Sequence, residues 1–106
     1  MEKNRLEDIS LKNIKITDKF WNKYRSLVKD VIIPYQWNTL NDQVADAAPS
    51  HSIENFRIAA GEKDGEFYGA VFQDTDVAKW LEAVAYVLES QGRDEKLENL
   101  ADDTID

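Results

Sequence analysis

The residues between Val77 and Leu88 place apolar side chains at steps of three and four, which is the spacing of one face of an α-helix. A helix with such a face must bury it against another element. Gly92 follows the last turn and is suited to end the helix. Thr75 or Asp76 precedes the first apolar residue and is predicted to cap the helix by accepting a backbone N–H. The predicted buried face consists of Val77, Trp80, Leu81, Val84, Ala85 and Leu88.

Two more helices are predicted ahead of this one. The first begins after Thr17 or Asp18 and carries an apolar stripe, so that its Trp21 is predicted to be a core residue, as is Trp80. Pro34 lacks an amide hydrogen and disfavours helical geometry at the residue before it, so this helix is predicted to end near residue 32. The second runs from Ser50 or Ser52 to about residue 60. The first stripe consists of Phe20, Trp21, Tyr24, Leu27, Val28 and Val31.

The last segment again shows helical spacing, and the sequence stops within it. Carboxylates occupy its end, where they face the negative end of the helix dipole, so the helix is expected to be cut short. The predicted fold class is therefore all-α, with three to four helices and long connectors over residues 33–50 and 61–75. Residues 1–13 are predicted to be a flexible lead-in, and residues 14–106 one domain segment. The apolar residues of the last segment are Leu97, Leu100, Ala101 and Ile105.

Charge and composition narrow the classes of partner. The net charge is −8, and residues 62–106 hold thirteen acids against four bases. This balance argues against binding to nucleic-acid phosphates or to an anionic membrane surface. No apolar run approaches the roughly 20 residues that span a bilayer, and the polar start does not resemble a signal peptide, so a cytoplasmic location is expected. The absence of cysteine excludes disulfides and thiolate metal ligands within this chain.

An aromatic residue, an amide and a carboxylate stand together at Phe72, Gln73 and Asp74, although one capping residue is enough to start a helix. Amides and carboxylates bind sugar hydroxyls, and an aromatic ring offers an apolar face to the sugar ring. Phe72, Gln73 and Asp74 are therefore candidate sugar-binding residues. Trp37, beside Gln36, falls outside any helical stripe and is predicted to form a cavity wall. The alternative for Asp74 is that it only stabilises the start of the helix.

Other candidate groups receive simpler interpretations. His51 cannot form a metal site by itself, because a zinc site needs three or four ligands, and it is predicted to pack or to cap a helix. Glu62, Asp64 and Glu66 are predicted to be a solvated acidic loop, since nothing there raises a carboxyl pKa by burial. No complete catalytic constellation is present, so the sequence predicts no catalytic residue and no metal ligand in this chain.

Three blocks in order, "IPYQW" with "LND", "SHSIENFRIAAGE" and "FQDTDVAKWLEAVAY", resemble the N-terminal portion of the β-L-arabinofuranosidases of glycoside hydrolase family 127. The resemblance runs from about Ile14 to the end. It implies the first part of an (α/α)6 toroid, in a longer enzyme that removes β-L-arabinofuranose with retention of configuration. It also implies a cysteine nucleophile held on zinc together with glutamates, none of which lies at a matching position here. The resemblance also implies a substrate-binding set of five residues: Phe72, Gln73 and Asp74, with Trp37 and Gln36 behind them. The connector between Asp42 and Ser50 is shorter than is usual in the family.

Two hypotheses follow from these observations. The first is a fragment of such a glycosidase, inactive alone, that contacts carbohydrate in the full-length context and associates with itself or with a missing complementary segment. No cofactor is expected in this chain, although zinc is implied for the full-length family. The alternative is a free-standing acidic helical module that binds a basic protein partner. An open piece of a toroid is expected to expose Leu97, Leu100 and Ile105, whereas an independent module would enclose them.

Overall fold

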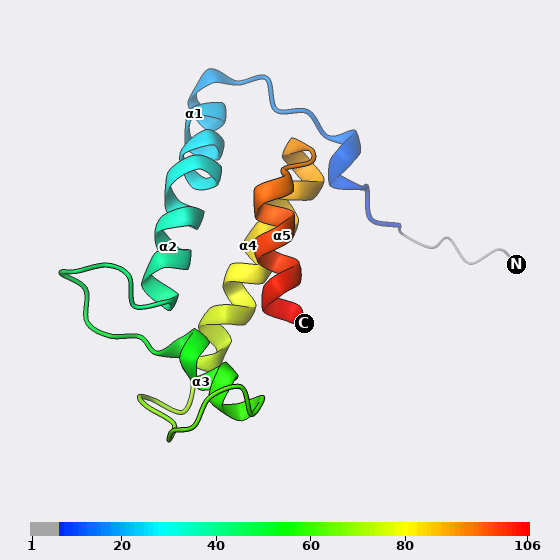
Figure 1. Ribbon diagram of the computed structural model, residues 1–106. Coiled ribbons are helices and arrows are strands. Elements are labelled where there is room, and N and C mark those ends of the chain that lie inside the picture. The colour runs from blue at the N-terminus through cyan, green and yellow to red at the C-terminus, as the bar shows by residue number, and fades with distance from the viewer. Residues whose placement is uncertain (1–6) are drawn as a thin grey trace, which may run out of the picture.

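The computed structural model describes residues 7–106, and this part of the chain is helical with no β-strand. Helix α1 (Lys19–Leu27), the π-helical turn η2 (Val28–Ile32) and α2 (Ile33–Leu40) run on as one helix (Figure 1). Then follow α3 (Ser52–Ala59), α4 (Asp74–Gln91) and α5 (Glu95–Ile105), and a short 3-10 turn, η1 (Leu11–Asn13), precedes them all. The predicted all-α class, with three to four helices and long connectors, is confirmed.

The helix that the sequence predicts to end near residue 32 instead continues through Pro34 to Leu40. The amide of Ile33 donates to the carbonyl of Val28, five residues back, so the turn ahead of the proline is wider than an α-turn. In a regular α-helix the proline ring clashes with the carbonyl four residues back. The wider turn relieves this clash, and residues 33–40 become a helix rather than a connector.

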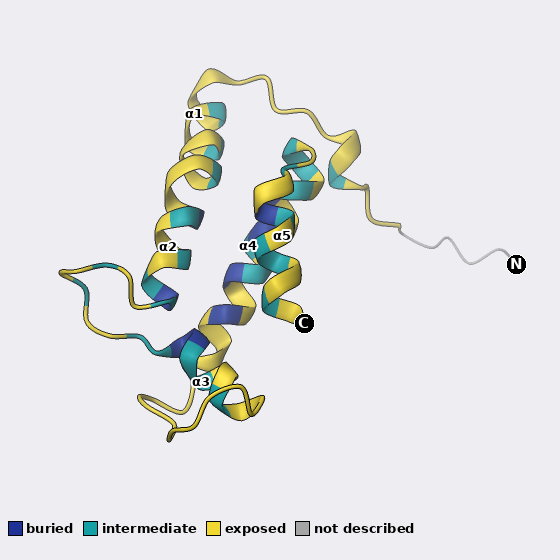
Figure 2. Ribbon diagram, in the orientation of Figure 1, coloured by how far each residue is buried: buried dark blue, intermediate teal, exposed yellow. Residues whose placement is uncertain are grey.

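Helix α4 is the centre of the fold, because η1, α2, α3 and α5 all pack against it (Figures 1 and 2). Trp80 is 2% exposed and confirms its predicted core position. Ala85, predicted to be buried, is exposed, and Val87 takes a buried place instead. The buried apolar residues are Ile33, Leu40, Ile53, Val77, Trp80, Val84, Val87 and Leu97.

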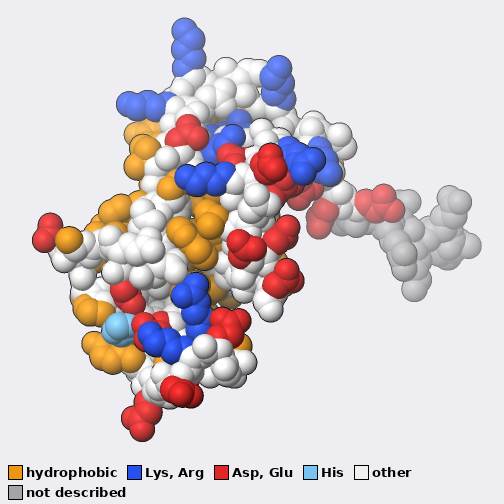
Figure 3. Space-filling model, in the orientation of Figure 1, with side chains coloured by type: hydrophobic (Ala, Val, Ile, Leu, Met, Phe, Trp, Pro, Cys, Tyr) orange, Lys and Arg blue, Asp and Glu red, His pale blue; other side chains and the backbone are white. Residues whose placement is uncertain are grey.

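The stripe on α1 lies on the surface, so the prediction that Trp21 is a core residue is wrong. Its side chain is 59% exposed, because no element in residues 7–106 packs over this side of the helix. Figure 3 shows hydrophobic side chains gathered along the edge formed by α1 and α2. We call this exposed set the α1 face. Its members are Phe20, Trp21, Tyr24, Leu27, Val28, Val31, Ile32 and Tyr35.

The last helix is only half covered. Leu97 is buried, Leu100 is partly buried and Ile105 is 69% exposed. Asp94 caps α5 by accepting the amide of Leu97 at 3.1 Å. The predicted exposure therefore holds for the end of α5 and fails for its first turn, which packs on α4.

The caps of the other helices test the sequence predictions. Asp18 caps α1 by accepting the amide of Trp21 at 2.9 Å, as predicted. Helix α4 begins at Asp74, one or two residues ahead of the predicted caps, with Gln73 in the N-cap position. The Thr75 hydroxyl donates to the carbonyl of Phe72 at 2.8 Å and does not cap the helix. The prediction that Thr75 or Asp76 caps α4 is therefore wrong: both lie inside its first turn.

Two further predictions concern the end of α4 and the first residues of the chain. Gly92 adopts a φ of +90° directly after α4, as predicted for its end. The lead-in prediction stays untested, because residues 1–6 lie outside the described part, while the 3-10 turn η1 (Leu11–Asn13) contacts α4. Among the residues described, no helix has both the length and the apolar character needed to cross a membrane.

Candidate functional site

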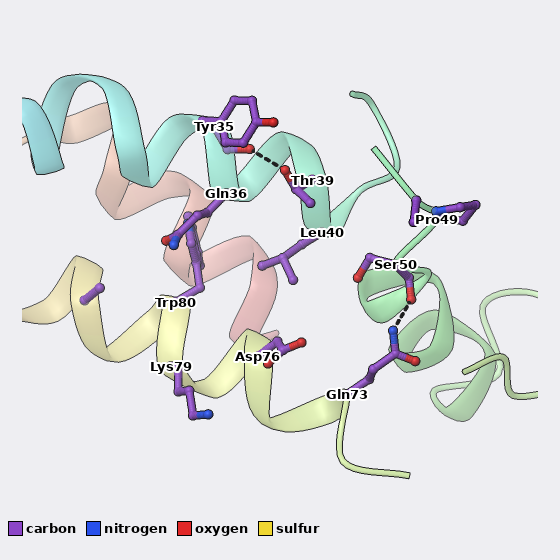
Figure 4. A pocket seen from close by; sticks show the side chains of 12 residues that line it. Tyr35, Gln36, Thr39, Leu40, Pro49, Ser50, Gln73, Asp76, Lys79 and Trp80 are labelled. Carbon is purple, nitrogen blue, oxygen red and sulfur yellow. Dashed lines mark hydrogen bonds between the residues drawn. The ribbon is translucent and has the colours of Figure 1, made fainter. Parts of the chain in front are cut away.

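A hollow of about 650 Å³ opens between α2, α4 and the end of the connector that leads into α3 (Figure 4). Its walls combine a largely apolar floor with a few polar side chains, as binding pockets for small molecules do. We call it the α2–α4 pocket. Its lining residues are Tyr35, Gln36, Thr39 and Leu40 from α2, Ala48, Pro49 and Ser50 from the connector, and Gln73, Asp76, Lys79, Trp80 and Ala83 from the start of α4.

The α2 wall exists because the helix continues past Pro34. Gln36, Thr39 and Leu40 are spaced by three and four residues, so they share the side of α2 that faces α4. Leu40 is 7% exposed and closes the floor, while Gln36 points toward Trp80 (Figure 4). The amide of Gln36 has no hydrogen-bond partner among the described residues and is available to a ligand.

The α4 wall is formed by Asp76, Trp80 and Ala83. These residues are spaced by four and three positions, so they lie on one side of the helix. Trp80 forms the floor, and its orientation is set by a hydrogen bond from its Nε1 to the carbonyl of Ile33 at 3.1 Å. Asp76 lies in the first turn of α4, where its negative charge interacts favourably with the positive end of the helix dipole. Asp76 is the only carboxylate among the pocket-lining residues.

Gln73 joins two walls of the pocket. Its Nε2 donates to the carbonyl of Ser50 at 2.9 Å, and its Oε1 accepts the amide of Ala70 at 2.9 Å. One N–H and one lone pair of the side-chain amide remain for another partner. A Cβ at Gly69 would lie 1.6 Å from Gln73 Oε1, and the φ of Gly69 is +101°, so this residue must be glycine for the arrangement to form.

The connector wall is held from behind by Asp42. Its Oδ1 accepts the amides of Ser50 at 2.6 Å and His51 at 3.0 Å, which closes residues 43–49 into a loop. His51 stands in the N-cap position of α3, and its ring packs edge-on against Tyr68 with centroids 4.5 Å apart. Of the two predicted roles of His51, packing is the one observed. Its side chain makes no capping hydrogen bond.

Glu54, in the first turn of α3, lies close to this wall and has a lowered pKa. A hydrogen bond from Lys63 Nζ at 2.7 Å, together with the charge of that lysine, lowers the pKa of Glu54 below its ordinary value. The acidic residues Glu62, Asp64 and Glu66 lie exposed on the loop that follows α3, as the sequence predicts for a solvated acidic cluster.

The structure brings two of the five predicted substrate-binding residues together, Gln36 and Gln73. Trp37 packs on Trp80 with ring centroids 4.7 Å apart and lines another hollow, of about 420 Å³, between α2 and α5. Phe72 is 68% exposed, and neither it nor Asp74 lines the α2–α4 pocket.

Sequence reasoning missed the pocket roles of Asp76 and Thr39. The sequence pattern predicts Asp76 as a possible cap of α4. It places Thr39 in a connector, because Pro34 predicts the end of the preceding helix. The available signal was the series Ile33, Trp37 and Leu40, whose spacing of four and three continues the helical period beyond the proline.

Residues 13–106 match the family model described as "Beta-L-arabinofuranosidase, GH127 catalytic domain". The chain belongs to the GH127 family. A "Non-reducing end beta-L-arabinofuranosidase" of Bifidobacterium longum subsp. longum is 42% identical to it over 106 aligned positions, covering 89% of this chain. The crystal structure of a GH127 β-L-arabinofuranosidase from Geobacillus stearothermophilus T6 superposes with a TM-score of 0.84 at 66% identity, covering 88% of this chain.

This GH127 chain spans 16% of the length of the Bifidobacterium relative and 14% of the Geobacillus chain. The resemblance to the N-terminal portion of the family is therefore confirmed, as is a helical arrangement like the first part of an (α/α)6 toroid. The sequence holds no cysteine that could supply the thiolate ligands which the resemblance implies for the family's zinc. We therefore assign no catalytic step to the residues of this chain.

Proposed function

We propose that this GH127 segment forms one wall of a carbohydrate-binding cavity for a β-L-arabinofuranosyl residue, and that it hydrolyses no glycoside alone. The observation that carries the proposal is the match of residues 13–106 to the GH127 catalytic domain. Both relatives described above are named β-L-arabinofuranosidases. The activity of such whole enzymes is extended to this chain only as part of this proposal.

The chemistry of the α2–α4 pocket supports sugar binding. Gln36 offers an amide without an internal partner, and Asp76 offers a carboxylate that accepts hydrogen bonds from two hydroxyls. Trp80 and Leu40 provide the apolar floor against which the C–H face of a sugar ring packs. Phe72 and Asp74 lie outside the α2–α4 pocket, and we propose that they contact the sugar only from the outer rim of this pocket. We propose that Trp37 supports the ring of Trp80 from the side away from the pocket.

The residues that line the α2–α4 pocket also support the proposal that the chain alone does not hydrolyse a glycoside. Glycosidases that retain configuration place two reactive groups about 5–5.5 Å apart, one as nucleophile and one as acid and base. Asp76 has no second carboxylate beside it among the pocket-lining residues. The chain also spans only 16% of the curated relative, so most of that enzyme's residues have no counterpart here.

The α1 face favours a second, compatible role in association. Its aromatic and aliphatic side chains form an uncovered stripe of a kind that usually meets a protein partner. We propose that another copy of the chain or a complementary polypeptide covers it. A basic protein partner for the acidic surface of α5 is the rival form of this proposal, supported by the four acids and one base of that helix.

The test of the sugar proposal is a titration of the ¹⁵N-labelled chain with methyl β-L-arabinofuranoside, followed by amide chemical shifts. The shifts are expected to concentrate on α2 and the first turns of α4, with millimolar affinity. Gln36→Ala and Asp76→Asn should each weaken binding at least about threefold. Gln36→Ala should leave the thermal midpoint unchanged, because its side chain has no hydrogen-bond partner among the described residues, whereas Asp76→Asn should lower it slightly by removing a charge that interacts favourably with the helix dipole. Asp103→Asn, on the exposed side of α5, is the matched control.

Two results would contradict the proposal. One is binding that is absent, or that stays the same in Gln36→Ala and Asp76→Asn. The other is release of a chromophore by the wild-type chain from a nitrophenyl β-L-arabinofuranoside above the rate without protein, since this would show hydrolysis by the segment alone.

A further inference from the structure

Asp42, His51 and Glu54 converge on one point behind the connector wall. They come from three places in the chain: the turn after α2, the residue before α3 and the first turn of α3. Each offers one nitrogen or oxygen atom, and these three atoms all lie within 4.8 Å of one another. None of the three residues lines the α2–α4 pocket.

The Nδ1 atom of His51 is buried and has no hydrogen-bond partner. It lies 2.8 Å from Asp42 Oδ2, but a hydrogen on this nitrogen would not point at that oxygen, so the short distance does not amount to a hydrogen bond. Buried polar atoms of folded proteins nearly always have a partner. A protonated imidazole would form ion pairs with Asp42 and Glu54, whereas a neutral imidazole with its proton on Nε2 offers Nδ1 to a cation between the two carboxylates.

The distances around Nδ1 resemble those between neighbouring ligands of one metal ion. Bonds of about 2.1 Å to nitrogen and oxygen place such neighbours about 3.0 Å apart in an octahedron and about 3.4 Å apart in a tetrahedron. The observed separations from Nδ1 are 2.8 Å to Asp42 Oδ2 and 3.5 Å to Glu54 Oε2. The ligand oxygens of Asp42 and Glu54 lie within 4.8 Å of each other.

Each carboxylate has one oxygen held by a neighbouring donor and one that faces the His51 imidazole. Asp42 Oδ1 accepts the backbone amides of Ser50 and His51. Asp42 Oδ2 also accepts the His51 amide, at 3.1 Å, and keeps a second lone pair for another partner. Glu54 Oε1 is held by Lys63 Nζ, while its Oε2 lies toward the imidazole. Ligating carboxylates in metal sites are commonly oriented by outer hydrogen bonds of this kind.

We propose that His51 Nδ1, Asp42 Oδ2 and Glu54 Oε2 bind a divalent first-row transition-metal ion such as Zn²⁺, with water completing its coordination. An imidazole nitrogen with two carboxylate oxygens suits such an ion. Three protein ligands fall short of the six to eight oxygens that Ca²⁺ takes. The proposal rests on these three residues and does not depend on sugar binding.

The test is isothermal calorimetry of the tag-free chain with ZnCl₂, with CaCl₂ as the comparison ion. We expect one Zn²⁺ per chain and a thermal midpoint that rises with Zn²⁺. His51→Gln and Glu54→Gln should each weaken the affinity at least about tenfold. Asp46→Asn, which removes a carboxylate from the same connector outside the cluster, should leave the affinity unchanged. Co²⁺ added in place of Zn²⁺ should show visible absorption that Glu54→Gln alters.

Glu54→Gln decides the matter if His51→Gln fails to fold, because it leaves the bonds between Asp42 and the amides of Ser50 and His51 intact. Equal Zn²⁺ affinity in the wild type and Glu54→Gln would overturn the proposal. So would the absence of binding, or several weak sites that Asp46→Asn reduces as much as Glu54→Gln does, since these outcomes describe general attraction to surface acids.

Discussion

Trp80 and Ile33 are joined by a hydrogen bond of 3.1 Å between the indole Nε1 and the backbone carbonyl, 47 residues apart in sequence. Both residues are almost fully buried, at 2% and 1% exposure. The bond ties the middle of α4 to the helical turn that carries Pro34. It thereby sets both the floor of the α2–α4 pocket and the direction of its α2 wall.

Replacing Trp80 with phenylalanine should therefore destabilise the fold. The change keeps an aromatic ring but removes the indole N–H that donates to the Ile33 carbonyl. It also leaves unfilled space where the larger indole ring was buried. We expect the free energy of unfolding to fall by about 1–3 kcal/mol. Urea denaturation followed by circular dichroism measures it. Trp21→Phe, the same substitution at a 59% exposed site, should change it by less than about 0.5 kcal/mol. Equal losses in the two variants would show that the bond is not formed.

Gly69 and Gln73 should behave as a coupled pair. An alanine at Gly69 would place its Cβ against Gln73 Oε1 and hold a side chain at a φ of +101°. We expect Gly69→Ala to lower the free energy of unfolding by about 1–3 kcal/mol. In a Gln73→Ala background the steric part disappears, so the same change should cost at least about 0.5 kcal/mol less. A double-mutant cycle measured by thermal denaturation checks this, and strict additivity would contradict it.

The α1 face should promote association of the isolated chain. We expect the weight-average mass from sedimentation equilibrium to rise above 12.2 kDa as the concentration increases. Trp21→Gln combined with Leu27→Gln removes apolar area from this face and should keep the mass near that of the monomer. Tyr86→Gln changes an equally exposed aromatic residue on α4 and should not. A wild-type chain that stays monomeric at millimolar concentration would refute this prediction.

Glu54 should titrate at a lower pH than an ordinary glutamate. Its hydrogen bond and charge interaction with Lys63 stabilise the ionised form, which places its pKa below 4.5. Because the folded-state pKa is the lower one, the interaction stabilises the fold above pH 4.5 and this contribution is lost as the pH falls through the folded-state pKa. The ¹³C carboxyl shift of Glu54 against pH measures it, and Lys63→Met should move the midpoint upward. An unchanged midpoint would exclude Lys63 as the cause.

Several features of the fold could be predicted from local patterns alone. The stripe of α4, the glycine that follows it and the cap at Asp18 depend on neighbours within a few residues. The glycine and the cap lie where the sequence predicts them, and so does the stripe apart from the exchange of Ala85 for Val87. The resemblance to GH127 was likewise carried by short blocks of residues. Such features follow from helical period and backbone hydrogen bonding, which act at short range along the chain.

The pocket could not be predicted to the same extent, because its walls meet only in three dimensions. Gln36 and Gln73, two of the predicted substrate-binding residues, share the α2–α4 pocket, whereas Trp37 packs on Trp80 and lines the neighbouring hollow between α2 and α5. The rule that proline ends a helix failed because a π-turn ahead of Pro34 relieved the steric clash.

The sequence by itself determined that the chain is all-helical, the approximate places of α1, α3, α4 and α5, and which family the chain resembles, because these depend on nearest neighbours. It did not determine that residues 33–40 are helical. Only the tertiary structure decided which apolar stripe is buried. The stripes of α1 and α4 have the same period, yet Trp80 is enclosed and Trp21 is exposed, since burial depends on which faces find a packing partner and not on the pattern of the face alone.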